Sequence, residues 1–153
     1  MSKIGSVRLG NVPRVVLCVH GNLPVVAEAV GEGIDILEVR VDLFENLNPE
    51  SVVNEVKGLR RHQLPMIGTV RTAMEGGAAS IPEAKRVELY TKIAGLVDAI
   101  DVDLNAKTLK DIIKVVRMNK KALILSHHNF DETPSDASLD AIVQKAHALG
   151  ADI

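Results

Sequence analysis

The sequence predicts an α/β fold, a (β/α)₈ TIM barrel of which the 153 residues cover about five β/α units and the start of a sixth strand. Short apolar runs alternate with helical segments, and no low-complexity linker separates them. Hydrophobic residues make up 46% of the chain but aromatic residues only 2%, so aliphatic side chains must fill the core, as in buried parallel strands. We therefore expect a single partial barrel domain over residues 1–153.

Two observations favour a barrel over a doubly wound sheet. The first loop, Cys-Val-His-Gly-Asn at 18–22, is not a G-x-G-x-x-G phosphate-binding fingerprint. Polar residues also recur on one face at the carboxyl ends of successive strands, where barrel enzymes have their active sites. A complete barrel takes about 250 residues, so roughly five-eighths of one is expected here.

Prolines, glycines and a helix cap mark the first two units. Residues 15–19 form a short apolar strand, and the helix predicted at 23–30 has a proline in its first turn and glycines at its exit. Residues 34–41 form the second strand. Asn48 is a good N-cap for the next helix, and Pro49 suits its first turn. The apolar stripe of that helix consists of Val52, Val53, Val56 and Leu59.

The same alternation predicts three further units. Their strands are expected at 66–70, 99–104 and 122–126. Their helices are expected at 80–97, at 108–118 and from 135 up to Gly150. Ser135 caps the last of these helices, and Asp152 begins a sixth strand. A chain that stops as a strand begins is expected to be cut from a longer barrel.

Composition and charge exclude several classes of protein. A net charge of −2 without a basic patch argues against nucleic-acid binding. Cys18 is the only cysteine, so no internal disulfide is expected and a reducing cytoplasm is the natural location. The first residues show no signal peptide, and no stretch approaches the roughly 20 apolar residues of a membrane helix. We expect a soluble, cytoplasmic protein without a membrane partner.

Charged residues alternate with aliphatic ones in the second strand. Glu38, Arg40 and Asp42 share one face of the strand, and the aliphatic residues share the other. Because helices cover the outside of a barrel, the charged face should point inward, where burial is costly unless charges pair or bind something polar. The later strands repeat the pattern with Thr69, Arg71, Asp101, Asp103, Ser126 and His128. An internal ion-pair network is one interpretation, but recurrence on four strands favours a site.

At these residues the chain resembles the type I 3-dehydroquinate dehydratases, Schiff-base lyases of the shikimate pathway. The matching segments are E-V-R-V-D at 38–42, R-T-A-M-E-G-G at 71–77, S-H-H-N-F at 126–130 before Thr133-Pro134, and G-A-D-I at 150–153. The resemblance covers essentially the whole chain in the right order and spacing. The ordered set is specific, whereas E-x-R-x-D alone is weak.

The resemblance implies dehydration of 3-dehydroquinate to 3-dehydroshikimate, a hydro-lyase step in chorismate and aromatic amino acid biosynthesis. A lysine amine forms an imine with the substrate ketone, a histidine removes the acidified proton, and the enamine expels the hydroxyl group as water. The substrate is a small molecule, and the reaction in this scheme requires neither a cofactor nor a metal ion. A histidine also suits base catalysis near neutral pH.

The resemblance also implies roles for individual residues. His128 matches the catalytic base, and Glu75 matches the acid that orients it. Glu38 and Arg71 match residues that hold the ring hydroxyls of the substrate, and Arg40 matches one close to the reacting carbons. The sequence departs from the family pattern at Cys18, a position where family members often have a serine that contacts the substrate. A thiol is a weaker hydrogen-bond partner.

The imine-forming lysine of the family lies in the sixth strand, in a pattern like Ala-Asp-Ile-Val-Lys, about two residues beyond Ile153. Lys145 should face solvent on the fifth helix, and Lys120 and Lys121 precede the fifth strand at the opposite end of the barrel. None is a good substitute. We therefore expect the 153-residue chain to be inactive alone and, with unpaired sheet edges, to form a homodimer or other self-association.

Three hypotheses follow from the sequence. The chain belongs to a type I dehydroquinate dehydratase, to another Schiff-base barrel enzyme of the aldolase type, or to a noncatalytic partial barrel that serves as an assembly module. Glu38-x-Arg40 and the residues after His128 favour the first. The reading frame beyond Ile153 would separate the enzymes from the module.

Overall fold

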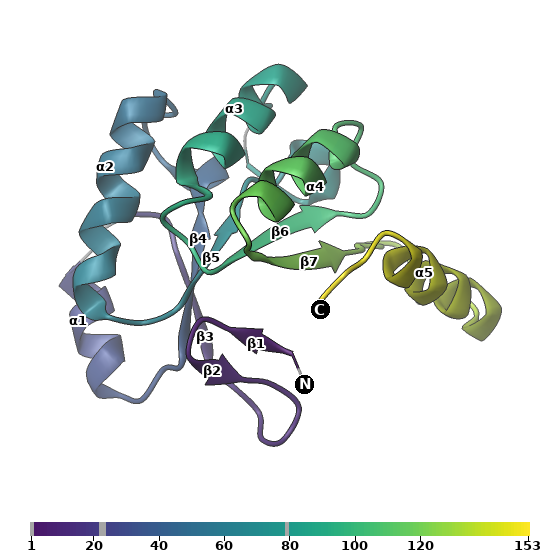
Figure 1. Ribbon diagram of the computed structural model, residues 1–153, viewed down its shortest axis with the longest axis horizontal. Coiled ribbons are helices and arrows are strands. Elements are labelled where there is room, and N and C mark those ends of the chain that lie inside the picture. The colour runs from purple at the N-terminus through teal and green to yellow at the C-terminus, as the bar shows by residue number, and fades with distance from the viewer. Residues whose placement is uncertain (1, 22–23, 79) are drawn as a thin grey trace.

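Five parallel strands lie side by side in the order in which they occur along the chain (Figure 1). The computed structural model describes residues 2–21, 24–78 and 80–153. The strands of this sheet are β3 (Val16–Val19), β4 (Ile36–Arg40), β5 (Met66–Thr69), β6 (Ala99–Asp103) and β7 (Ala122–Ser126). The helices are α1 (Pro24–Gly31), α2 (Pro49–Leu59), α3 (Glu83–Ile93), α4 (Leu109–Met118) and α5 (Asp136–Ala148). The alternation confirms the five predicted β/α units.

Local chemistry explains where the elements differ from the predicted ranges. Strand β4 ends at Arg40 because a 3₁₀ turn over Val41–Leu43 follows it directly. Helix α3 is shorter than the predicted 80–97, since Pro82 precedes its first turn. Leu23, the predicted start of the first helix, lies outside the described residues.

Hydrogen bonds show the two predicted helix caps and the pairing of the last residues, where a sixth strand was predicted, with β7. The side chain of Asn48 accepts a bond from the amide of Glu50 at 3.0 Å, and Ser135 accepts one from Ser138 at 3.4 Å. The amide of Asp152 donates to the carbonyl of Leu123 at 2.9 Å. Residues 152–153 therefore run beside β7 in hydrogen-bonding contact.

Helices α2, α3 and α4 cover one face of the sheet (Figure 1). Leu37 and Val39 on β4 are fully buried in the cluster that also contains Val56, Leu89 and Ile112 from these helices. The prediction that the aliphatic face of the second strand packs against helices is confirmed. The opposite face is left for the alternating polar residues.

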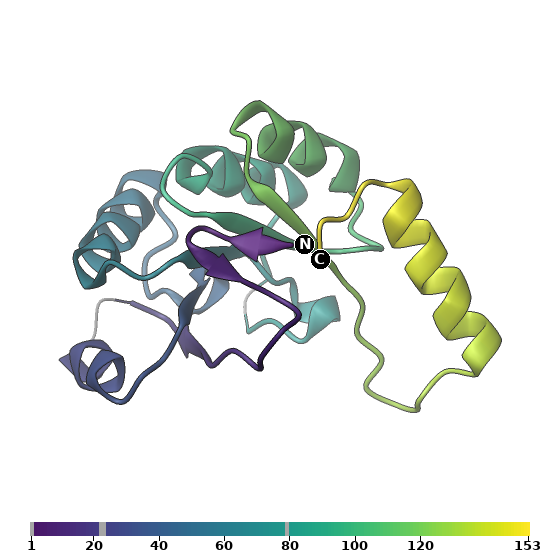
Figure 2. The same cartoon turned by 60° about the horizontal axis from the view of Figure 1, so that its bottom comes forward.

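A small N-terminal hairpin, which the sequence interpretation missed, closes the inner face near the amino ends of the strands (Figure 2). Strands β1 (Lys3–Ile4) and β2 (Val7–Arg8) pair antiparallel. Gly5 turns the chain between them with φ of +53°, and a Cβ there would come within 3.1 Å of Pro65. Its Ile4 packs with Ile36, Ile67 and Ala99 in a second apolar cluster.

Helix α5 stands away from the layer formed by the other helices (Figures 1 and 2), and none of its residues is buried. The two termini lie side by side, with the Ser2 hydroxyl donating to the carbonyl of Asp152 at 2.7 Å. Within the described part of the chain, no helix has both the length and the apolar character needed to cross a bilayer.

Candidate active site at the carboxyl ends of the strands

Strand register brings the predicted polar residues together on the inner face. Arg40 of β4 stands opposite Thr69 of β5, which stands opposite Asp101 of β6. Asp103 at the end of β6 stands opposite Ser126 at the end of β7. Since all these strands are parallel, their carboxyl ends meet at one rim, and the polar side chains form one layer above the apolar cluster closed by the hairpin.

Arg71 is held by a buried triangle of contacts. One terminal nitrogen, Nη2, lies 2.8 Å from Oδ1 of Asp101, and Nη1 donates to the hydroxyl of Ser126 at 2.8 Å. That hydroxyl donates to the same Asp101 oxygen at 2.9 Å. Burial raises the pKa of the Asp101 carboxyl, and the Arg71 charge opposes this rise. The guanidinium is thus fixed in place before any ligand arrives.

Arg40 and Glu38 on β4 also have defined partners. The Arg40 guanidinium makes a two-pronged contact with Asp42, at 2.9 Å and 2.7 Å, and this hydrogen bonding raises the Arg40 pKa. Asp42 also accepts a bond from the backbone amide of Arg71 at 3.1 Å. The Thr69 hydroxyl donates to Glu38 at 2.9 Å. The ion-pair network that the sequence left open as an alternative interpretation is therefore present, and it positions both arginines.

Glu75 has a different partner from the one expected. Its Oε2 lies 2.8 Å from Nη2 of Arg86, which is fully buried on α3, and accepts the Thr72 amide at 3.3 Å. Arg86 in turn donates to the carbonyl of Val70 at 2.8 Å, so the carboxylate is drawn toward α3. Among the described residues no hydrogen bond joins Glu75 to His128, which differs from the predicted orienting contact.

The carboxylate beside His128 is that of Asp103. Nδ1 of His128 lies 3.3 Å from Oδ2 of Asp103, whose side chain is 7% exposed. The Phe130 ring stacks on the imidazole, with ring centroids 6.0 Å apart and planes 12° apart. His127 faces away, with its Nδ1 3.4 Å from the Asn105 side chain. The histidine pair therefore diverges, as predicted, and His128 alone faces the acidic residues.

The loops after β5 and β7 meet at Gly76. This residue has φ of +81°, and a Cβ on it would lie 2.6 Å from the tip of Phe130. Glycine is thus needed both for the backbone conformation and for the contact with the ring that stacks on His128. The loop carrying Glu75 and the loop carrying His128 are coupled through this contact.

Cys18 at the end of β3 lies at the same rim. The residue is exposed, and partial desolvation of its thiol, followed by the charge of Glu38, raises the thiol pKa. The thiol is therefore protonated near neutral pH and acts only as a weak hydrogen-bond partner.

The lysines named in the sequence analysis lie away from this layer. Nζ of Lys145 donates to the Asn105 side chain at 3.0 Å, on the outer side of β7. Lys120 and Lys121 line a hollow with Ser2 and Asp98 at the amino ends of the strands. In the ranges that the structure describes, no group of three His, Cys, Asp or Glu side chains is arranged to hold a metal ion.

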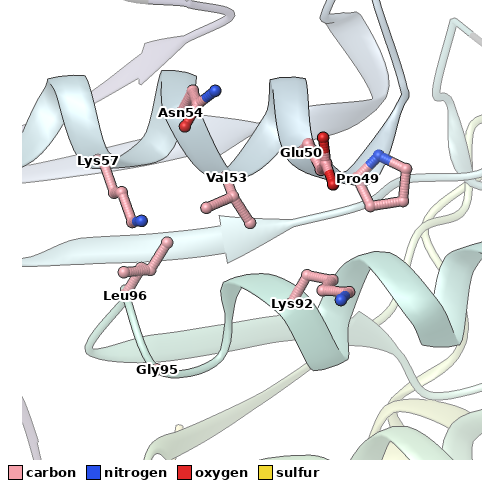
Figure 3. A pocket seen from close by; sticks show the side chains of 8 residues that line it. All are labelled: Pro49, Glu50, Val53, Asn54, Lys57, Lys92, Gly95 and Leu96. Atoms are coloured by element: carbon pink, nitrogen blue, oxygen red, sulfur yellow. The ribbon is translucent and has the colours of Figure 1, made fainter.

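A hollow lies between α2 and α3 (Figure 3), two of the helices that cover the aliphatic face of the sheet. It is lined by Pro49, Glu50, Val53, Asn54, Lys57, Lys92, Gly95 and Leu96. The lysine and glutamate side chains at its edges form no buried cluster, and nothing in it brings acid and base together.

Asp103 and Arg86 are two charged contributors to which the sequence analysis assigned no individual role. Asp103 was part of the alternating pattern, and its position opposite Ser126, two residues before His128, could have indicated the pair. Arg86 gave no such signal, because a charged residue on a helix is usually solvated.

Together, these features define a β/α-barrel protein with an enzyme-like site, in which a histidine–carboxylate pair and two fixed arginines meet at the carboxyl rim. Residues 15–153 match the family model described as type I 3-dehydroquinase. The chain belongs to this family.

Known relatives agree with that assignment. The chain is 34% identical to the 3-dehydroquinate dehydratase of Methanococcoides burtonii, over all of this chain and 67% of that protein. A crystal structure of the Clostridium difficile type I 3-dehydroquinate dehydratase, with covalently modified comenic acid, superposes with a TM-score of 0.83. That match has 28% identity and covers 91% of this chain and 59% of the other. The chain thus spans about three-fifths to two-thirds of the length of these relatives.

A Schiff-base-forming fructose-1,6-bisphosphate aldolase is also similar in structure. The match has a TM-score of 0.55 and 17% identity, and covers 82% of this chain and 51% of the aldolase. At this identity the likeness concerns the fold alone. The aldolase-type hypothesis from the sequence thus gains no support beyond the shared scaffold, whereas the family match supports the dehydratase hypothesis.

Proposed function

We propose that this chain supplies the base and the substrate-holding residues of a 3-dehydroquinate dehydratase that works through a lysine Schiff base. The observation that carries the proposal is the pair formed by His128 and the buried Asp103, at the rim where Arg40 and Arg71 are already fixed. Family membership and the name of the M. burtonii relative support the reaction. The covalently modified ligand of the C. difficile enzyme supports covalent chemistry.

In the proposed reaction, the lysine nitrogen attacks the ketone carbon of 3-dehydroquinate, and water leaves as the imine forms. The cationic imine acidifies the neighbouring C–H bond. His128 removes that proton, and the electron pair of the C–H bond forms the enamine. The enamine then expels the β-hydroxyl group, to which His128 returns the proton, and a second water leaves. Hydrolysis of the imine consumes one water and releases 3-dehydroshikimate, so the net change is loss of one water.

The fixed charges suit the substrate in this scheme. Arg71 and Glu38 would hold ring hydroxyls, because both side chains are anchored by partners that leave them little freedom. Arg40 would keep a positive charge near the reacting carbons. Such a cation disfavours protonation of the attacking amine, which must be neutral to react. Glu75 would act through its loop, which packs on Phe130 beside His128.

The test is a chimera in which residues 1–153 are followed by the remaining C-terminal part of the M. burtonii dehydratase. We expect this completed barrel to convert 3-dehydroquinate to 3-dehydroshikimate, followed by product absorbance, and to keep its rate after treatment with a chelator. The isolated chain should have no measurable turnover, because Lys145, Lys120 and Lys121 lie away from the polar layer in the described structure. A folded chimera without turnover, or an isolated chain with turnover, would contradict the proposal.

We expect the isolated chain to self-associate, with a homodimer as the simplest form. Strand β3 forms one edge of the sheet, and residues 152–153 beside β7 form the other. Apolar side chains are exposed along both edges, namely Val15 and Val16 at β3 and Ile153 beside β7, and Val143 of α5 is exposed next to the second edge. Sedimentation velocity of the isolated chain should detect species larger than the monomer at micromolar concentration. The chimera should form assemblies of fewer chains. A monodisperse, cooperatively melting monomer of the isolated chain would be the opposite outcome.

This proposal also gives the expected cellular setting. A biosynthetic enzyme with a single cysteine, which cannot form an internal disulfide, suits the cytoplasm, and neither nucleic acid nor a membrane is a partner in the proposed reaction.

A further inference from the structure

We propose that Asp103, and not Glu75, is the positioning residue that sets the tautomer of His128. The inference rests on the proposed function of His128 as the base. Asp103 is the carboxylate within hydrogen-bonding distance of the imidazole, at 3.3 Å from Nδ1. Glu75 is engaged instead by Arg86 and the Thr72 amide.

Asp103 is itself held in one orientation by its own turn. Its Oδ1 accepts the backbone amide of Asn105 at 2.7 Å, and its Oδ2 faces Nδ1 of His128. The side chain is almost buried, so neither oxygen can turn toward bulk water without losing a contact. The two oxygens therefore have separate and fixed tasks.

An ionised carboxylate can only accept hydrogen bonds, so the Nδ1 of His128 must carry the proton. The neutral ring is then the Nδ1–H tautomer, with the lone pair on Nε2. Within the described residues, Nε2 makes no hydrogen bond, and Phe130 stacked on the ring restricts its rotation. Asp103 thus leaves Nε2 as the atom that accepts a proton from the substrate.

The turn at Asn105 makes the substitution Asp103→Asn diagnostic. The amide oxygen of the new side chain must take the place of Oδ1, because the Asn105 N–H needs an acceptor there. Its NH₂ group is then directed at His128, and an NH₂ group favours a ring whose Nδ1 is the acceptor. The variant should therefore hold the opposite tautomer, with the proton on Nε2 and no lone pair for the substrate.

The experiment is ¹⁵N NMR of the imidazole nitrogens in the 153-residue chain, labelled at histidine and recorded in mildly alkaline solution where imidazoles are neutral. We expect the Nδ1–H form of His128 to dominate in the unaltered chain, and D103N to shift the tautomer ratio toward Nε2–H by at least roughly tenfold. D131N is the matched control, since it removes an exposed aspartate from the segment after β7 that carries His128. E75Q should also leave the ratio unchanged.

The outcome in the unaltered chain is decisive even where D103N does not fold, because a dominant Nε2–H form of His128 would overturn the proposal. A shift of the ratio in E75Q but not in D103N would overturn it as well. In the chimera, D103N should lower kcat far more than it changes KM. The tautomer is read without turnover, so an inactive chimera with an Asp103-dependent tautomer would contradict the proposed function while supporting the positioning role.

Discussion

Replacing His128 with alanine in the chimera should lower kcat on the order of 10²–10⁴-fold, which is typical when a positioned general base is lost. KM should change much less, because the arginines that would hold the substrate have partners of their own and do not depend on the imidazole. Imine formation should also slow, since the proposed base assists proton transfers in that step. Steady-state kinetics with 3-dehydroquinate measure both parameters.

His127→Ala is the control for this experiment. His127 follows the same strand, but its ring faces Asn105. Its replacement should leave kcat within about a factor of two, because substitution of an exposed residue usually has a small effect. Equal rates for the chimera with and without His128 would show that the base has been assigned to the wrong residue.

Replacing Arg71 with methionine should destabilise the folded chain by about 3–5 kcal/mol at neutral pH, the usual cost of removing one partner from a buried ion pair. The Arg71 and Asp101 side chains are only 8% and 11% exposed, so water can do little to replace the lost partner. Urea unfolding of the chimera, followed by far-UV circular dichroism, measures this free energy. In the chimera, the same variant should raise KM, since Arg71 is proposed to hold the ring hydroxyls.

The loss of stability should depend on pH in a defined direction. Burial already raises the Asp101 pKa above its ordinary 3.8, and without the Arg71 charge the pKa in the folded state rises further. Between the unfolded and folded values the folded state binds more protons, so the unfolding free energy falls as pH increases through that window. The variant should therefore be closest to the original chain in acid and weakest at neutral pH.

The double variant R71M/D101N separates this effect from simple loss of packing. An asparagine at 101 has no charge to leave unpaired, so most of the stability should return and the pH dependence caused by the Asp101 carboxyl should disappear. If R71M alone matched the original chain across the pH range, the Arg71–Asp101 pair would contribute nothing to the fold.

The period-two alternation on β4 predicted the inner polar face, and the structure confirms it, because a strand offers only two faces and the helices take the aliphatic one. The helix caps at Asn48 and Ser135 were also predictable, since each depends on one side chain and a nearby amide. The β1–β2 hairpin was missed because its strands have two residues each, although Gly5-Ser6 between short apolar-charged pairs is a turn signal.

The partners of the site residues depended on long-range packing and could not be derived from local pattern. Glu75 contacts Arg86 because α3 packs closely on Val70. There the carbonyl of Val70 accepts a hydrogen bond from the buried Arg86 guanidinium, which brings Arg86 within reach of Glu75. The Asp103–His128 pair depends on the alignment of β6 with β7, which fixes the strand ends to one rim. A sequence indicates both residues but not which of two nearby carboxylates the imidazole will face.

The most direct test of the proposed role of this chain is the intact mass of the chimera after borohydride treatment with 3-dehydroquinate. An imine between substrate and lysine is reduced to a stable amine, so the mass should increase by one covalently bound ligand. Peptide mapping should locate the ligand on the lysine of the donated sixth strand, and H128A should still form the adduct, although more slowly. Full turnover with no trapped adduct would contradict the Schiff-base account in which this chain provides the base and the substrate contacts.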